Sequence, residues 1–181
     1  FNQLSPEGKE YSEELLDLSR RIRLVTQDVQ DGFGHAVWCA RDFVGGEPFL
    51  LMLGDHVYRS DNDDPCARQV LDVHEKVGHS VVGLKTTAGS DIHRFGTVAG
   101  LWDNGGRQLT VTELEEKPEL DFARRHLRTE GLADDEFLTV FGMYVLEPSV
   151  FEYLEEAIDN NVREGGEFRL TPCLDRVRRE E

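Results

Sequence analysis

Hydrophobic and polar positions in the first half of the chain alternate between strand-like and helix-like patterns. Residues 23–27 form a short run typical of a strand, and residues 35–42 place small and apolar side chains at helical spacing. Residues 49–53 are apolar on both faces, which predicts a central strand covered by helices on two sides. The helical pattern returns at residues 66–77 and ends at a glycine, and residues 80–87 are predicted to form a third strand.

The second half of the chain has a different rhythm. Residues 96–102 and 108–114 flank an Asn-Gly pair at 104–105, which predicts a β-hairpin. Pro118 is expected to end the second strand, because proline has no N–H for the ladder. Further elements are predicted as a helix at 121–128, a strand at 138–146, a helix at 148–158 and a last helix that opens at Thr171-Pro172. The pattern is that of one layered α/β domain.

Composition and charge exclude several classes of protein. The chain has 181 residues and a formal net charge of −16, so it lacks the clustered cations that a nucleic-acid backbone binder needs. Its longest apolar run, residues 48–53, is far shorter than the roughly 18 residues of a membrane span. Three cysteines without paired spacing predict a reduced, cytoplasmic protein with no disulfide or cysteine-bound metal.

Candidate chemistry follows the ends of two predicted strands, where ligands bind in open α/β sheets. The Gln27 amide can donate to and accept from a base edge, and Gly32 and Gly34 let the backbone approach a flat ligand. The alternative is a strand-to-helix turn whose glycines have a geometric role only. Asp55 is suited to Mg²⁺, which prefers oxygen ligands, although aspartate at a strand end is also a common cap or turn residue.

A third candidate is the acidic and basic run that precedes Pro118. Glu116 is suited to accept hydrogen bonds from sugar hydroxyls, and Lys117 to hold a phosphate. The alternative is an ordinary solvated charge run. Successive side chains of a strand point to opposite faces, so both can reach one ligand only where the strand bends or ends. Pro118 is expected to supply that end and to keep Lys117 extended.

Several segments, taken in order, resemble the nucleotide-sugar pyrophosphorylases. The Gly-x-Gly-His-Ala-Val form is most similar to bacterial UTP–glucose-1-phosphate uridylyltransferases. The matching segments are Val-Thr-Gln at 25–27, Gly-Phe-Gly-His-Ala-Val at 32–37, Leu-Gly-Asp at 53–55, Arg-Phe-Gly-Thr-Val at 94–98, Leu-Glu-Glu-Lys-Pro at 114–118, Phe-Gly-Met-Tyr-Val-Leu at 141–146 and Gly-Gly-Glu-Phe-Arg-Leu-Thr at 165–171. The resemblance extends from about residue 13 to the end of the chain.

The resemblance implies an enzyme that makes UDP-glucose and pyrophosphate from UTP and glucose 1-phosphate with Mg²⁺. It implies a Rossmann-like three-layer nucleotidyltransferase domain over residues 1–181, with a mixed, mostly parallel sheet and a β-hairpin insertion. It also implies a role for each of these residues: Gln27, Gly32, Gly34 and His35 for the nucleotide; Gly96, Glu116, Gly142, Tyr144 and Glu167 for the sugar; Lys117 for the sugar phosphate; and Asp55 for the metal, with Asp55 and Lys117 as the catalytic pair. The partners expected are the two substrates, with no nucleic acid and no membrane, and a homo-oligomer is left open.

Departures from the family pattern limit what is expected of this chain alone. The Gly-rich triphosphate loop that opens the family's domain is not present, nor is a second metal-binding aspartate, and Pro172 stands where an acidic residue is usual. The chain, which begins at Phe1, is therefore expected to be a fragment that is inactive by itself. A thymidylyl-, cytidylyl- or adenylyltransferase of the same fold, and a non-catalytic nucleotide-sugar-binding regulatory homologue, remain alternatives.

Overall fold

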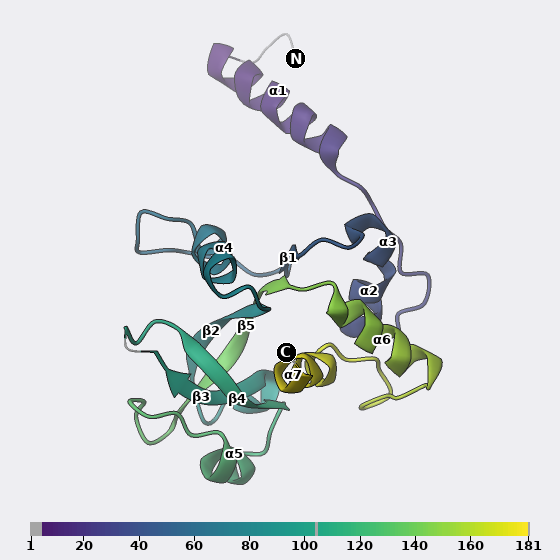
Figure 1. Cartoon of the computed structure of the whole chain (residues 1–181). Helices are drawn as coiled ribbons and strands as arrows, with labels where there is room; N and C mark the ends of the chain where they lie inside the picture. Colours follow the sequence, from purple (N-terminus) through teal and green to yellow (C-terminus); the bar gives the residue numbers. More distant parts are fainter. Residues whose placement is uncertain (1–4, 104, 181) are drawn as a thin grey trace.

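A computed structural model describes residues 5–103 and 105–180 (Figure 1). In chain order its elements are α1 (Pro6–Arg21), α2 (Phe33–Cys39), α3 (Arg41–Val44), β1 (Phe49–Met52), α4 (Cys66–Val77), β2 (Val81–Ala88), the 3-10 helix η1 (Ile92–Arg94), β3 (Gly96–Trp102), β4 (Leu109–Glu116), α5 (Leu120–His126), β5 (Glu136–Leu146), α6 (Ser149–Asp159) and α7 (Thr171–Glu180). The bounds of α4 and β3 are those predicted. The helix expected at 35–42 is instead the two short helices α2 and α3.

Strand β5 organises the sheet, because it pairs with three of the other four strands. β2 runs along one of its edges, β1 and β3 occupy the other edge, and β4 lies beyond β3. Every strand pair among the described residues is antiparallel, so the prediction of a mostly parallel sheet is wrong. β1 and β2 do run in the same direction, but β5 lies between them in the opposite direction and takes up their hydrogen bonds.

Two of the strand predictions in the first half need correction. Residues 23–27 form no strand, and Leu24 there is 93% exposed. Strand β1 is four residues long and Met52 is 43% exposed, so it is not the fully covered central strand that its apolar sequence predicts. Residues 49–52 are apolar by composition, but within the described residues they lack the covering layers that would bury them on both faces. Residues 23–27 include polar and charged side chains and belong to no strand of the described sheet.

The predicted hairpin is present as β3 and β4, with Gly96 opposite Glu116 and Trp102 opposite Leu109. Asp103 holds the turn, because its Oδ1 accepts hydrogen bonds from the backbone N–H groups of Gly105, Arg107 and Gln108. Asn104 of the expected Asn-Gly turn lies outside the described residues. The second strand ends at Glu116, two residues before Pro118, as predicted.

Helices cover both faces of the sheet. Tyr144 and Leu146 of β5 pack with the buried faces of α6 and α7 and with Val37 of α2 in the main core. Phe137, from the opposite face of β5, packs with Ala123 of α5 in a second core. In Figure 1, α2, α6 and α7 accordingly lie together, and α4 and α5 lie apart from them. This α/β arrangement places the starts of α2 and α7 on the same side of the sheet.

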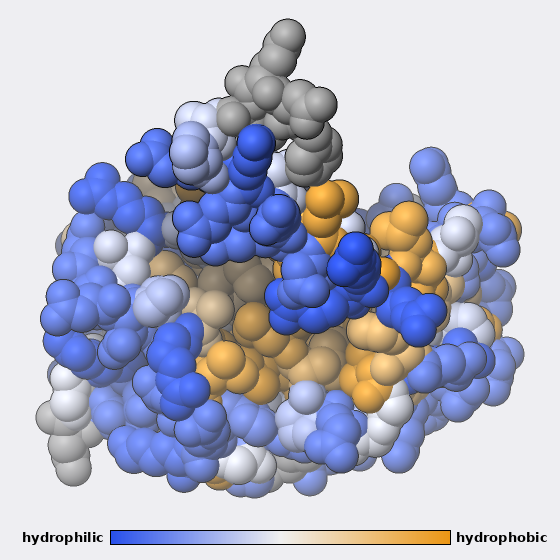
Figure 2. All heavy atoms as spheres, turned by 90° about the horizontal axis from the view of Figure 1, so that it is seen from above, coloured by the Kyte–Doolittle hydropathy of each residue, from blue (hydrophilic) through white to orange (hydrophobic). Residues whose placement is uncertain are grey.

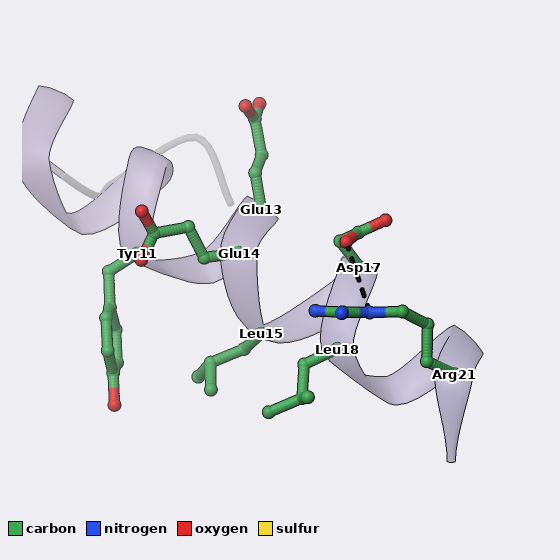
Figure 3. Close-up of a pocket in the computed structure, with 7 residues that line it drawn as sticks. All are labelled: Tyr11, Glu13, Glu14, Leu15, Asp17, Leu18 and Arg21. Carbon is green, nitrogen blue, oxygen red and sulfur yellow. Dashed lines mark ion pairs between the residues drawn. The ribbon is translucent and has the colours of Figure 1, made fainter. Parts of the chain in front are cut away.

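Helix α1 extends away from the rest of the chain, and none of its residues is buried (Figure 1). Figure 3 shows Tyr11, Leu15 and Leu18 on one side of α1, with Asp17 on the other side paired to Arg21. These side chains border a surface depression that is lined by residues of α1 alone. It is therefore an open helix face rather than a ligand cavity. No hydrophobic pattern in the sequence predicted a helix over Pro6–Arg21.

Apolar surface is also exposed on the main body. Figure 2 shows apolar side chains gathered in the hollowed middle of the face seen from above, with polar side chains around them. Within residues 5–103 and 105–180, no helix combines the length and apolar character needed to cross a membrane. The three cysteines are free thiols in the structure.

Candidate nucleotide- and sugar-binding site

Backbone hydrogen bonds hold the turn before α2 against Phe168, more than 130 residues further along the chain. The N–H of Gly34 donates to the Phe168 carbonyl at 2.9 Å, and the N–H of Phe168 donates to the Asp31 carbonyl at 3.0 Å. Gly32 has a φ of +98°, and a Cβ on it would lie 2.6 Å from the Phe168 oxygen. Only glycine fits there, so the glycines of this turn allow two backbones to meet.

Gln27 and His35 complete this first group of predicted nucleotide-binding residues. Gln27 Nε2 donates to the Gly32 carbonyl at 3.0 Å and lies 2.9 Å from His35 Nδ1. The His35 ring stacks on Trp38, with centroids 5.8 Å apart, and lies 6.3 Å from the ring of Phe168. The structure therefore brings together the four residues predicted to bind the nucleotide.

An ion pair that sequence reasoning missed supports the same turn. The Arg163 guanidinium binds both carboxylate oxygens of Asp31, with Nη2 2.8 Å from Oδ2, and stacks 4.0 Å from the centre of the Phe168 ring. The hydrogen bonds and charge of Arg163 hold the pKa of Asp31 below its ordinary value. Nothing in the local sequence distinguishes this arginine from other surface arginines, so only tertiary structure identifies the pair.

The second group lies around Glu116, at the end of β4. Glu116 Oε2 accepts a hydrogen bond from the Thr171 hydroxyl at 2.7 Å. Gly96 is its partner in β3, and a Cβ there would be in ordinary van der Waals contact with that carboxylate, 3.4 Å from Oε2. Tyr144 is buried nearby, and burial, together with the charge of Glu116, raises its pKa to about 12. Its phenol is therefore protonated at neutral pH and can donate a hydrogen bond.

Two cations lie beside the same oxygen of Glu116. Lys117 Nζ is 3.7 Å from Oε1, and Arg169 Nη1 is 3.9 Å from it. Lys117 is not extended as predicted, since its φ is +49°. Lys117 thus departs from the extended backbone that a following proline favours, and in this left-handed turn its Nζ lies on the same side as the Glu116 carboxylate. Sequence reasoning missed both Arg169 and Thr171.

The carboxyl end of β1 is tied to a bulge in β5. The Gly142 carbonyl accepts hydrogen bonds from the Leu53 N–H at 3.0 Å and from the Tyr58 hydroxyl at 2.5 Å. Gly142 has a φ of +61°, and a Cβ there would lie 2.6 Å from His56 Nδ1. Gly142, predicted as a sugar-binding residue, is thus also the residue that positions the loop carrying Asp55.

Asp55 is exposed, and within the described residues its side chain makes no hydrogen bond or ion pair. No group of three or more metal-ligating side chains exists in that part of the chain. A single unpaired carboxylate still fits Mg²⁺, which is commonly held by one or two carboxylates while substrate phosphates and water supply the other ligands.

Glu167 lies with the first group rather than with Glu116. Its Cβ would be 2.9 Å from a Cβ on Gly32, and its carboxylate is at an exposed position. The short segment from Glu167 to Thr171 consequently carries both groups, because Phe168 contacts the glycine turn while Arg169 and Thr171 contact Glu116.

The α/β fold is that of a nucleotidyltransferase. The chain belongs to the nucleotidyl transferase family, whose model matches residues 2–170. The chain is 36% identical over 171 residues to the UTP–glucose-1-phosphate uridylyltransferase of Staphylococcus epidermidis, covering 94% of this chain and 52% of that protein. It is also 36% identical over 173 residues to UTP–glucose-1-phosphate uridylyltransferase 2 of Staphylococcus saprophyticus, covering 96% and 53%. The chain thus spans about half the length of these curated relatives.

Solved structures share the fold. A UDP-glucose pyrophosphorylase complexed with UDP-glucose superimposes with a TM-score of 0.73 at 23% identity, covering 98% of this chain and 63% of that one. The UDP-glucose pyrophosphorylase from Acinetobacter baumannii gives 0.67 at 20% identity, covering 97% and 57%. At this level of identity the likeness establishes the fold alone.

The close approach at Gly34 gives a prediction for stability. A Cβ there would lie 2.8 Å from the carbonyl carbon of Arg169 and the oxygen of Phe168, both of them backbone atoms. We expect Gly34→Ala to lower the free energy of unfolding by about 2 kcal/mol, typical of overpacking and larger than the gain in helix propensity of at most ~1 kcal/mol. Urea unfolding of Gly34→Ala against the matched control Gly46→Ala, whose new Cβ meets nothing within 4 Å, measures this. Equal stability of the two variants would contradict the packing described.

Proposed function

We propose that residues 1–181 form one nucleotidyltransferase domain of an enzyme that makes UDP-glucose and pyrophosphate from UTP and glucose 1-phosphate. The observation that carries the proposal is the position of the segment from Glu167 to Thr171. This segment contacts the glycine turn beside Gln27, where the base is proposed to bind, and it also contacts Glu116 with its neighbouring cations. A nucleotide-sugar has a base at one end and a sugar at the other, so a ligand of this class is matched by two such groups on one side of a sheet.

The proposed reaction is a direct displacement. A phosphate oxygen of glucose 1-phosphate attacks the α-phosphorus of UTP, the bond from that phosphorus to the bridging oxygen breaks, and pyrophosphate leaves with the electron pair. No covalent enzyme intermediate is involved, so the protein acts by positioning its substrates and neutralising charge. Lys117 would hold the attacking phosphate, with Arg169 as a second cation next to it.

The remaining roles are those that the family resemblance implies, and we propose them here with the contacts that support them. Glu116 would accept hydrogen bonds from sugar hydroxyls, held in place by Thr171, and Tyr144 would donate one. Gly96 would offer its backbone to the sugar, Gly142 would help to line the sugar pocket by positioning the loop after β1, and Glu167 would contact the ligand between the two groups. The nucleotide would be bound by Gln27, Gly32, Gly34 and His35.

Asp55 is the residue proposed to hold Mg²⁺, which would neutralise phosphate charge when bound. Its carboxylate has no hydrogen bond or ion pair in the part of the chain that the structure describes, which supports this assignment, since a residue already in an internal ion pair would have to give that pair up. A cytoplasmic location, with the two substrates as the main partners and neither nucleic acid nor membrane involved, is part of the same proposal.

The test is an assay of the protein as its gene encodes it, with each of the four ribonucleoside triphosphates and with dTTP, in the presence of glucose 1-phosphate and Mg²⁺. We expect pyrophosphate and nucleotide-sugar to form in equal amounts, fastest with UTP. A faster reaction with dTTP, CTP or ATP would replace the uridylyl assignment with the corresponding transferase. UDP-glucose binding without turnover would instead support a regulatory protein.

A further inference from the structure

We infer that His35 is a positioning residue that fixes the Gln27 amide so that only its oxygen is offered to the base. The site would thereby select bases that carry a ring N–H donor, uracil among them, over those that carry a ring lone pair, such as cytosine. The inference rests on the proposed function in one respect, which is that Gln27 faces the base.

The first step is the hydrogen-bond accounting at Gln27. The Gly32 carbonyl can only accept, so the atom 3.0 Å from it is the amide nitrogen, and one N–H is used there. The second N–H of the same nitrogen faces His35 Nδ1 at 2.9 Å. His35 Nδ1 must then be an acceptor, which makes the ring neutral with its proton on Nε2.

The second step concerns the rigidity of His35. Its ring is stacked on Trp38 with an interplanar angle of 19°, and the Trp38 ring is in turn covered by the Arg41 guanidinium at 3.8 Å. His35 Nε2 lies 3.9 Å from Cys39 Sγ, a weak acceptor for the remaining ring proton. A ring held on its face and at both nitrogens presents a second fixed acceptor beside the Gly32 carbonyl, and the two acceptors together keep the Gln27 amide from rotating by 180°.

The consequence is that Gln27 Oε1 is the one polar group of this side chain left for a ligand. Among the described residues Oε1 has no hydrogen-bond partner. Uracil presents a ring N3–H that this oxygen can accept, whereas cytosine presents a lone pair at N3, which leaves two acceptors facing each other. A freely rotating glutamine would instead match either base, because it could turn its NH₂ toward cytosine.

The first experiment needs no nucleotide. Nitrogen-15 NMR of the ligand-free chain reports which ring nitrogen of His35 carries the proton. We expect an unprotonated Nδ1 and a protonated Nε2, with the Nδ1 signal shifting in Gln27→Leu because its hydrogen bond is lost. A proton on Nδ1 would overturn the inference.

The second experiment measures discrimination between bases. His35→Phe keeps an aromatic ring against Trp38 and Phe168 but removes the acceptor, and His35→Asn restores an acceptor. We expect the native chain to bind UDP-glucose at least tenfold more tightly than CDP-glucose, a difference of about 1.4 kcal/mol. That ratio should fall to about threefold or less in His35→Phe, recover in His35→Asn, and stay native in the control His79→Phe, which changes an exposed histidine.

A native ratio of UDP-glucose to CDP-glucose affinity in His35→Phe would overturn the positioning role. Equal weakening of both ligands, with that ratio preserved, would overturn it too, because a ring with a structural role alone would produce this result. Failure of every form to bind either nucleotide-sugar would count against the proposed function, and the tautomer of His35 would then decide the inference separately.

Discussion

Replacing Lys117 by methionine is expected to raise the KM for glucose 1-phosphate roughly 10- to 150-fold, since a hydrogen bond to a charged group contributes about 1.5–3 kcal/mol. Methionine keeps the length and apolar stem of the side chain and removes only the ammonium. Lys117 Nζ lies 3.7 Å from Glu116 Oε1, in the group proposed to bind the sugar, whereas the nucleotide is proposed to bind at Gln27. The KM for UTP should therefore remain close to native.

Lys76→Met is the matched control, because it removes the same charge from an exposed position on α4 and should change neither KM. Glu116→Gln tests the neighbouring residue by a different readout. It should reduce discrimination among sugar phosphates, since one charged acceptor becomes a neutral group with two new donors. An equal loss of UTP and glucose 1-phosphate affinity in Lys117→Met would show that Lys117 has been assigned to the wrong ligand.

Asp55→Asn is expected to lower turnover by at least about 100-fold, which corresponds to a loss of roughly 3 kcal/mol in transition-state stabilisation at a metal-dependent step. The fold should be unaffected, because Asp55 is exposed and its side chain makes no hydrogen bond or ion pair within the described residues. The measurement is kcat at saturating Mg²⁺ in the protein as its gene encodes it, together with urea unfolding of both forms.

The control for charge is Asp63→Asn, which removes an exposed carboxylate from the loop before α4 and should leave kcat unchanged. Near-native turnover of Asp55→Asn at saturating Mg²⁺ would remove this residue from the mechanism. A large loss of stability would instead mean that the carboxylate supports the loop after β1.

Local patterns predicted the elements whose signals are complete within a short stretch. Helix α4 has its apolar spacing within twelve residues and ends at Gly78, whose φ of +70° is the left-handed conformation that favours glycine at a helix end. The direction of the strands could not be predicted in the same way. The insertion of β5 between β1 and β2 depends on a strand that begins only at Glu136, well after β2 ends at Ala88, and nothing in the sequences of β1 and β2 records it.

The site residues that are close in sequence were likewise predicted better than those that are far apart. Gln27, the glycine turn and His35 are close in sequence, and the structure brings them together as predicted. Arg169 and Thr171 were missed because their importance comes from Glu116, more than 50 residues away. The position of Lys117 was predicted for a reason that is wrong, since the residue reaches Glu116 through a left-handed turn rather than an extended strand end.

One measurement tests the central claim most directly, namely that a single ligand spans both groups. Nitrogen-15-labelled chain is titrated with UDP-glucose while the backbone amides of Gly32, Gly34, Gly96 and Lys117 are followed by NMR. The account predicts that amides of both groups shift together with one dissociation constant, and that those of α1 do not move. Shifts confined to one group, two different dissociation constants, or no shift in either group at saturating UDP-glucose would contradict it.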